Sequence, residues 1–155
     1  MEQNVPKTER ELTLFLQNLR ARLERGFSSE TAAPGFEGST PSTGQCAAVA
    51  AVINQLLGGN LVSANVGGHS HWFNQISLGE ITVEIDLTGD QFGRPPLQIS
   101  QPSSLYPDTR LRTFNDLKPE TLLRSAVLAR RAGLTDAETA LRKCVQHKLD
   151  EEVSA

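Results

Sequence analysis

The chain has 155 residues, a formal net charge of -3 and 38% hydrophobic residues. This length suits one domain spanning residues 1–155 with a hydrophobic core of its own. The small acidic excess and the lack of a basic, aromatic-rich patch argue against nucleic-acid and anionic-membrane partners, and no apolar run reaches the roughly 20 residues of a transmembrane helix. Two well-separated cysteines and no signal-peptide pattern predict a reduced, cytoplasmic protein without a disulfide.

The first predicted helix covers residues 8–25. Thr8 and Glu11 have the spacing of a capping box, in which each side chain binds the backbone N–H of the other residue. Apolar residues then recur every three or four positions, as on one face of a helix: Leu12, Phe15, Leu16, Leu19 and Leu23. The same pattern predicts that four charged residues face water: Glu9, Arg10, Arg20 and Arg22.

A second helix is predicted over residues 46–57. It is apolar on almost every side, which is typical of a helix in the centre of a domain, and Gly58 suits its end. The preceding residues 26–44 are rich in Gly, Pro, Ser and Thr and predict a long loop. Because long loops in small domains often serve binding, we expect this loop to form a wall of a substrate cleft. A strand is predicted to follow over residues 61–66.

The clearest pattern is a hairpin of two strands, residues 71–76 and 81–88. We place Leu78 and Gly79 in a two-residue turn and obtain the register by counting back from it. This register puts His71 directly across from Asp86, close enough for a hydrogen bond between imidazole and carboxylate. The opposite face of the hairpin is mostly apolar and carries Trp72, Asn74, Ile76, Ile81, Val83 and Ile85.

The remaining residues predict a loop and two more helices. Residues 94–107 contain several prolines and indicate the loop, and the next helix covers residues 119–131 with a proline in its first turn. The last helix is predicted to begin with a second capping box, Thr135 and Glu138, and residues 150–155 are expected to fray. One face of this helix is apolar and carries Leu141, Cys144, Val145 and Leu149.

Cys46, His71 and Asp86 form the strongest candidate for a chemical site. A thiol at the start of a helix lies next to free N–H groups and the positive end of the helix dipole, which stabilise a thiolate. His71 would accept the thiol proton and later protonate a leaving group, while Asp86 would hold the imidazole in the required tautomer. The backbone N–H of Cys46 would bind the developing oxyanion, with Gln45 as the candidate for a second donor.

The residues around this triad resemble the bacterial YunG-type proteins. The resemblance covers roughly residues 10–131 and leaves the last helix outside it. The order of a cysteine at a helix start, then His-x-aromatic, then Asp-x-Thr is also similar to the transglutaminase-like branch of the papain-like enzymes. The resemblance to the YunG-type proteins is carried by Ser-Ser-Glu-Thr-Ala at residues 28–32, Gly-Gln-Cys-Ala-Ala-Val at 44–49, His-Trp-Phe-Asn at 71–74, residues 86–92 and residues 106–131.

These resemblances imply an α+β domain with a papain-like core. In such a core a nucleophile helix, here led by Cys46, packs on a small antiparallel sheet between flanking terminal helices. The triad roles would fall to Cys46, His71 and Asp86, which implies thiol-dependent acyl chemistry on an amide or thioester through a covalent thioester intermediate. We expect a protein, peptide or small amide substrate, no cofactor, and hydrolysis (by a peptidase, amidase or deamidase) in preference to transfer. The alternative is a non-enzymatic binding or regulatory module on the same fold.

His69 has no counterpart in the resembling proteins, which have a shorter run at this point. His69 and His71 point the same way on an extended strand, because residues two apart share a face. With Cys46 and Asp86 they form an alternative site for a divalent metal such as zinc. The simplest interpretation of the His-x-His pattern is nevertheless structural.

Trp72 and Asn74 complete the candidate cleft residues. Trp72 is expected to pack beneath the hairpin, with a role as a substrate platform as the alternative. Glu84 shares the strand face of the triad and is predicted to face water. Arg110 and Arg112 are predicted at the surface, where the alternative role is to clamp a substrate carboxylate.

Overall fold

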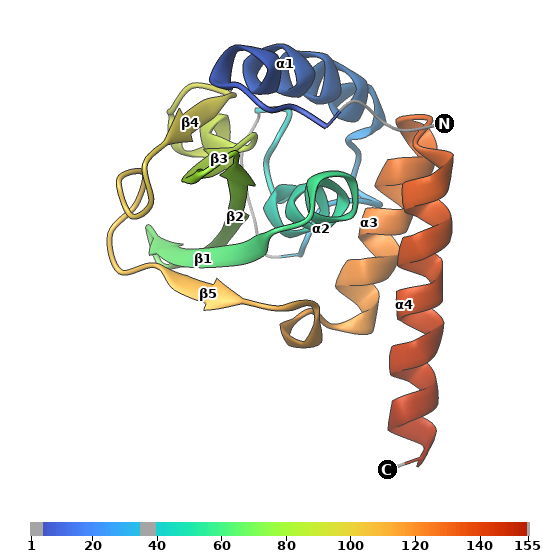
Figure 1. Cartoon of the computed structure of the whole chain (residues 1–155). Helices are drawn as coiled ribbons and strands as arrows, with labels where there is room; N and C mark the ends of the chain where they lie inside the picture. Colours follow the sequence, from blue (N-terminus) through green and yellow to red (C-terminus); the bar gives the residue numbers. More distant parts are fainter. Residues whose placement is uncertain (1–4, 35–39, 155) are drawn as a thin grey trace.

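The computed structural model describes residues 5–34 and 40–154, which form an α+β structure of four α-helices and a five-stranded antiparallel sheet (Figure 1). The strand order in the sheet is β4-β3-β2-β1-β5. Residues 35–39 of the predicted cleft loop lie outside the described residues. The elements in chain order are α1 (Glu9–Gly26), α2 (Cys46–Leu57), β1 (Asn60–Val66), β2 (His69–Leu78), β3 (Ile81–Asp86), η1 (Gly89–Phe92), β4 (Gln98–Ser100), β5 (Arg110–Arg112), η2 (Phe114–Asp116), α3 (Pro119–Arg131) and α4 (Thr135–Ser154).

Helix α2 is the centre of the structure. It lies between the sheet and α3, while α4 packs on the outer side of α3 and α1 crosses one end (Figure 1). The predicted bounds of α2 and its central position are confirmed. Its small apolar side chains allow close packing on several sides at once; the buried ones are Ala48, Val49, Ala50, Ala51, Val52 and Ile53. Within residues 5–34 and 40–154, no helix is both long and apolar enough to cross a membrane.

The β2–β3 hairpin turns one residue later than predicted. Leu78 pairs with Ile81, so Gly79 opens the two-residue turn with a φ of 65°. Such turns require a positive φ at their first position, which glycine adopts freely and leucine avoids. Relative to the predicted register, each residue of β2 pairs with a residue of β3 that lies two positions further along the chain. Because residues two apart share a face, every side chain keeps its predicted face. Asp86 is therefore diagonal to His71 instead of directly opposite.

Two charged residues that were predicted to face water are buried. The Arg20 guanidinium donates to the carbonyl oxygen of Leu87 (2.6 Å) and pairs with the Asp90 carboxylate (2.9 Å). The Glu84 carboxylate accepts the backbone N–H of Ser103 (3.0 Å). In both cases the partner is distant in sequence, so the periodicity of the helix or strand contains no sign of it. Each burial is possible because the charged groups find hydrogen-bond partners, although Arg20 Nε has none among the described residues.

Three predictions about the C-terminal half are also wrong. Residues 94–107 contain strand β4, which fits at the sheet edge because its three residues avoid the neighbouring prolines. Thr135 is the first residue of α4, and the N–H of Glu138 donates to the carbonyl of Leu134, so the predicted capping box does not form. Residues 150–154 are helical, since no glycine or proline interrupts α4 and bonded side-chain pairs four residues apart support it.

Asn74 joins the sheet to α2. Its side chain is buried, and its Nδ2 donates to the carbonyl oxygen of Ala50 in the middle of the helix (2.9 Å). The predicted cleft residue Asn74 thus lies in the core. Its amide satisfies a helix carbonyl while it holds α2 on β2.

We predict that Asn74→Ala lowers the free energy of unfolding by roughly 1–3 kcal/mol, because the substitution removes a buried hydrogen bond between two elements. Urea unfolding followed by circular dichroism measures this change. Ser77→Ala, at an exposed position of the same strand, is the matched control and should leave the free energy nearly unchanged. Equal, small effects of the two substitutions would contradict the role of Asn74.

Candidate active site

Cys46 is the first residue of α2. Its side chain is 3% exposed, and the thiol donates a long hydrogen bond to the carbonyl oxygen of Ser70 on β2 (3.9 Å). The first turn of α2 has neither a side-chain cap nor an acidic residue. This end of the helix therefore offers free N–H groups and an uncompensated dipole, which favour negative charge at the position of the sulfur.

His71 and Asp86 are hydrogen-bonded in the interior of the protein. His71 Nε2 lies 2.9 Å from Asp86 Oδ2, and the two residues are 0% and 1% exposed. The Tyr106 hydroxyl donates to the same carboxylate oxygen, and the N–H and hydroxyl of Thr88 donate to Oδ1 (2.9 and 3.3 Å). Because both oxygens are bound, the carboxylate has a fixed orientation toward the imidazole. The predicted contact between His71 and Asp86 is thus present, through a diagonal pairing.

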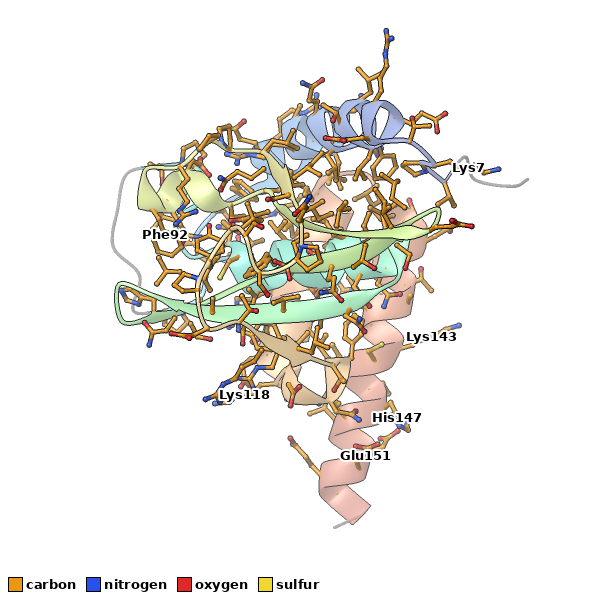
Figure 2. The ribbon with its side chains drawn as sticks, turned by 60° about the vertical axis from the view of Figure 1, so that its left-hand side comes forward. Lys7, Phe92, Lys118, Lys143, His147 and Glu151 are labelled. Carbon is orange, nitrogen blue, oxygen red and sulfur yellow. The ribbon has the colours of Figure 1, made fainter. Side chains whose placement is uncertain are left out.

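Aromatic rings enclose the imidazole. The rings of Phe92 and Tyr106 meet that of His71 edge-on at centroid distances of 4.9 and 5.0 Å, and Phe73 stacks at 5.8 Å. Figure 2 shows Phe92, the last residue of η1, on the same side of the molecule as the turn that joins β1 to β2. The Arg94 guanidinium lies over the Tyr106 ring at 4.2 Å. These rings keep water from the hydrogen-bonded pair, which strengthens its electrostatic interactions.

Burial and charge shift the pKa values of these groups in opposite directions. Burial by itself lowers the pKa of His71, but the Asp86 hydrogen bond, the nearby Cys46 thiol and the negative charge of these groups raise the pKa from 6.5 to about 9. Burial by itself raises the pKa of Asp86, but the bonds from His71, Tyr106 and Thr88 hold it below its usual value. Burial and the Asp86 charge raise the pKa of Tyr106. At neutral pH the pair is therefore imidazolium and carboxylate, with a neutral phenol as donor.

The second imidazole nitrogen, His71 Nδ1, is buried and has no hydrogen-bond partner among the described residues. Since Cys46 contributes to the raised pKa of His71, its sulfur lies near the ring. Asp86 binds Nε2, so Nδ1 is the ring nitrogen that remains without a partner. The structure brings the three predicted triad residues together, while the thiol itself is bonded to Ser70.

Gln45 lies directly before Cys46 and has a structural role. Its side-chain Oε1 accepts the hydroxyl of Thr31 (2.7 Å), and its Nε2 donates to the carbonyl oxygen of Ser28 (3.0 Å). Both ends of the amide are thus engaged, and the side chain is buried. Gln45 anchors the loop that leads to Cys46, so its side chain is not available as the second oxyanion donor in this conformation.

Trp72 is half-buried and lines a cavity beside α2. The guanidinium of Arg112 lies 5.7 Å from its ring centre and donates to the Ser63 hydroxyl (2.8 Å). Arg110 is exposed, as predicted. Of the candidates Gln45, Trp72 and Asn74, only Trp72 lines this cavity, and Pro34 of the predicted cleft loop lines it too.

The alternative metal site is not formed in the described residues. No group of three or more His, Cys, Asp or Glu side chains in residues 5–34 and 40–154 is arranged to hold a metal ion. His69 is exposed near the turn between β1 and β2, whereas His71 is buried against Asp86. The two histidines do not join Cys46 and Asp86 in a common set of ligands.

Asp90, which was not predicted as a site residue, connects the elements that carry the triad. Its carboxylate binds the Arg20 guanidinium of α1 through two bonds (2.9 and 3.1 Å) and the hydroxyl of Ser42 in the loop before Cys46. Burial raises the pKa of Asp90, but Arg20 and Ser42 lower it further than burial raises it. Because Asp90 follows Asp86 closely in the chain, this junction holds the loop before Cys46 against the end of β3, the strand that carries Asp86.

Gly89 shows how close this packing is. A Cβ at this position would lie 3.2 Å from Asp86 Oδ2 and 2.9 Å from the side chain of Gln98.

Tyr106 is the second residue of the site that the sequence did not predict, and it reaches Asp86 from an irregular loop. Tyr106 and Asp90 both lie in segments that carry the family resemblance, and this resemblance was the one sign in the sequence that they matter to the site. Residues on a loop follow no periodic pattern, so the sequence gives no indication of which side chain each of them contacts.

A family model described as YunG protein matches residues 15–132 of the chain. This match confirms the resemblance to the YunG-type proteins and leaves α4 outside it. Comparisons with curated proteins and with solved structures give no match. The relationship to papain-like and transglutaminase-like enzymes therefore stays a prediction.

We predict that His71 makes stability depend on pH between 6.5 and about 9. Its pKa is raised on folding, so its contribution is fully present below pH 6.5 and is lost as the pH rises through about 9. A shift of this size corresponds to a contribution on the order of 3 kcal/mol. Urea unfolding of the wild type and His71→Gln across this range measures it, and the difference between the two should shrink with rising pH.

His147, whose side chain is 76% exposed, provides the control, and His147→Gln should not change the pH profile of stability.

At acid pH the contribution of Asp86 to stability depends on pH in the opposite direction. Its pKa is lowered, so its contribution is present above pH 3.8 and is lost as the pH falls through the folded value. A wild-type profile that is flat between pH 6.5 and 9 would contradict the charged pair.

We predict that Asp90→Asn slows the alkylation of Cys46 by iodoacetamide roughly 10- to 100-fold, because small displacements of reacting groups have effects of this size. Mass spectrometry of each cysteine under native conditions gives the rate, and circular dichroism verifies folding. Glu138→Gln, which removes the exposed pair with Arg142, is the matched control. The same rate in both variants would show that Asp90 does not position the cysteine.

Proposed function

The chain belongs to the YunG protein family, and we propose that it is a thiol-dependent acyl hydrolase or transferase acting on an amide or thioester. One observation carries the proposal: the buried hydrogen bond between His71 and Asp86 leaves His71 Nδ1 without a partner, and Cys46, at a helix N-terminus, is near enough to raise the pKa of His71. A nucleophile, a base and a residue that orients the base are the three parts of such a mechanism. We further propose that α2 and its sheet form a papain-like core of the transglutaminase-like kind.

In this mechanism the reacting pair is a Cys46 thiolate and a His71 imidazolium, with the proton held on the imidazole. The sulfur attacks the substrate carbonyl carbon, and a carbon–sulfur bond forms. As the bond to the leaving amine or thiol breaks, the imidazolium donates its proton to the leaving group. A water molecule, or an acceptor amine in the case of transfer, then attacks the thioester after giving its proton to His71 and releases Cys46.

The environment of the pair suits these steps. A His71 pKa of about 9 keeps the imidazole protonated at neutral pH, ready to act as the acid. Asp86 stabilises the imidazolium and fixes which nitrogen faces the sulfur. The free N–H groups of the first turn of α2, beginning with that of Cys46, are donors for the oxyanion. We expect hydrolysis in preference to transfer.

The burial of the site favours one competing function. Cys46 and His71 are 3% and 0% exposed, so a substrate reaches the sulfur only after neighbouring residues move. A non-enzymatic binding or regulatory module that keeps the fold without turnover needs no such movement. In that case the same hydrogen bonds serve only to stabilise the core.

We predict that iodoacetamide alkylates Cys46 faster than Cys144 under native conditions. Exposure alone predicts the reverse order, because Cys144 is half-buried while Cys46 is almost fully buried. His71→Gln keeps the volume of the side chain and should slow the reaction at Cys46 roughly 100-fold, the size expected for loss of the general base. Mass spectrometry of the two peptides over time gives both rates.

His147→Gln, a substitution of an exposed histidine on α4, controls for a general effect of removing a histidine. It should leave both rates unchanged. Slow alkylation of both cysteines in the order of their exposure, with no effect of His71→Gln, would favour the binding module and contradict the enzyme.

A further inference from the structure

A cavity of about 350 Å³ lies beside the candidate active site. Ala47, the residue after Cys46 in α2, and Trp72, the residue after His71 on β2, both line it. Ser70, whose carbonyl accepts the Cys46 thiol, lies on the same face of β2 as Trp72. A group bound on the Trp72 ring would therefore lie against the residue that follows Cys46 in α2 and two residues from Ser70 along β2.

The walls of this cavity have a definite chemistry. Its inner wall is apolar, formed by Trp72 and Leu117 next to Ala47. Trp72 is half-buried and Leu117 is buried, so both offer apolar surface that is already partly shielded from water. Aromatic rings of this kind bind flat or apolar groups on their faces. The inner part of the cavity therefore suits an uncharged side chain.

The outer part of the cavity carries charges of both signs. Lys118 and Arg124 are cationic, and Asp116 and Glu120 are acidic. Figure 2 shows Lys118 at the surface of the molecule. Opposite charges in equal number give the cavity no net attraction for an anion or a cation, while their donors and acceptors can bind the N–H and C=O groups of a peptide backbone.

We propose that this cavity is the acyl-side subsite of the enzyme and that it takes a peptide whose residue before the scissile carbonyl has an uncharged apolar or aromatic side chain. The proposal rests on the proposed function, since it places the substrate of the same cysteine. It narrows that function to peptide substrates. A volume of about 350 Å³ holds an amino-acid side chain with adjoining backbone.

The experiment uses chloromethyl ketones, because they carry one warhead on different acyl groups. The Cys46 sulfur attacks the methylene carbon, a carbon–sulfur bond forms and chloride leaves, so no other reactant is needed. Chloroacetone supplies the bare warhead, and short N-acetyl peptidyl chloromethyl ketones ending in Phe, Glu or Lys supply the series. The rate of adduct formation at Cys46 is measured by mass spectrometry for each probe.

The wild type should react with the Phe probe at least roughly 10-fold faster than with chloroacetone, as expected for burial of one apolar side chain. The Glu and Lys probes should lack this advantage. Thr121→Phe fills the cavity from α3 without altering β2 or α2 and should remove the advantage of the Phe probe. Leu123→Phe introduces the same ring at an exposed position of the same helix and should keep it.

Several results would overturn the proposal. A Phe probe no faster than chloroacetone in the wild type, or Glu and Lys probes as fast as the Phe probe, would show that no subsite for an uncharged side chain exists. An unchanged Phe advantage in folded Thr121→Phe would show that this cavity is not the subsite. Failure of the proposed function would give a different result. Chloroacetone would then react with Cys46 no faster than with Cys144, regardless of the rates of the peptidyl probes.

Discussion

The hydrogen bond between His71 and Asp86 is the interaction on which the structure of this site depends. Two ionisable groups are almost completely removed from water, which is unfavourable unless each is paired and its remaining polar atoms are bonded. The carboxylate meets this condition through Thr88 and Tyr106. The imidazole meets it on one side only, because Nδ1 stays unpaired. An unsatisfied buried nitrogen next to a thiol is the feature that distinguishes a candidate site from ordinary core packing.

Much of the surrounding structure holds this pair in place. The junction at Asp90 ties α1 and the loop before Cys46 to the end of β3, and Gly89 allows the backbone to approach the carboxylate closely. The loop that carries Tyr106 covers the face of the sheet opposite α2, where Glu84 binds the N–H of Ser103. Ser103 has a φ of 64°, a conformation that is unfavourable outside glycine and persists only where the surrounding contacts fix it.

The closed state of the site links its chemistry to its dynamics. In the enzyme that we propose, movement of the covering residues is part of each reaction, and the low dielectric of the closed site strengthens the electrostatic interactions of the charged pair. In a binding module the same burial would be purely stabilising. The two functions thus share one ground-state structure and differ in whether the sulfur is reactive, which makes the reactivity of Cys46 the property that separates them.

The sequence by itself determined the bounds of α2 and α3 and the faces of the hairpin, and it named Cys46, His71 and Asp86 as the candidate triad. These features follow from short-range periodicity, from the conformational limits of glycine and proline, and from family resemblance. Only the tertiary structure decided that Arg20 and Glu84 are buried, that the hairpin turns at Gly79, and that Tyr106 and Asp90 support the site. Each of these depends on partners far apart in the chain, and the spacing of residues within one element does not encode which distant atoms will satisfy a buried charge.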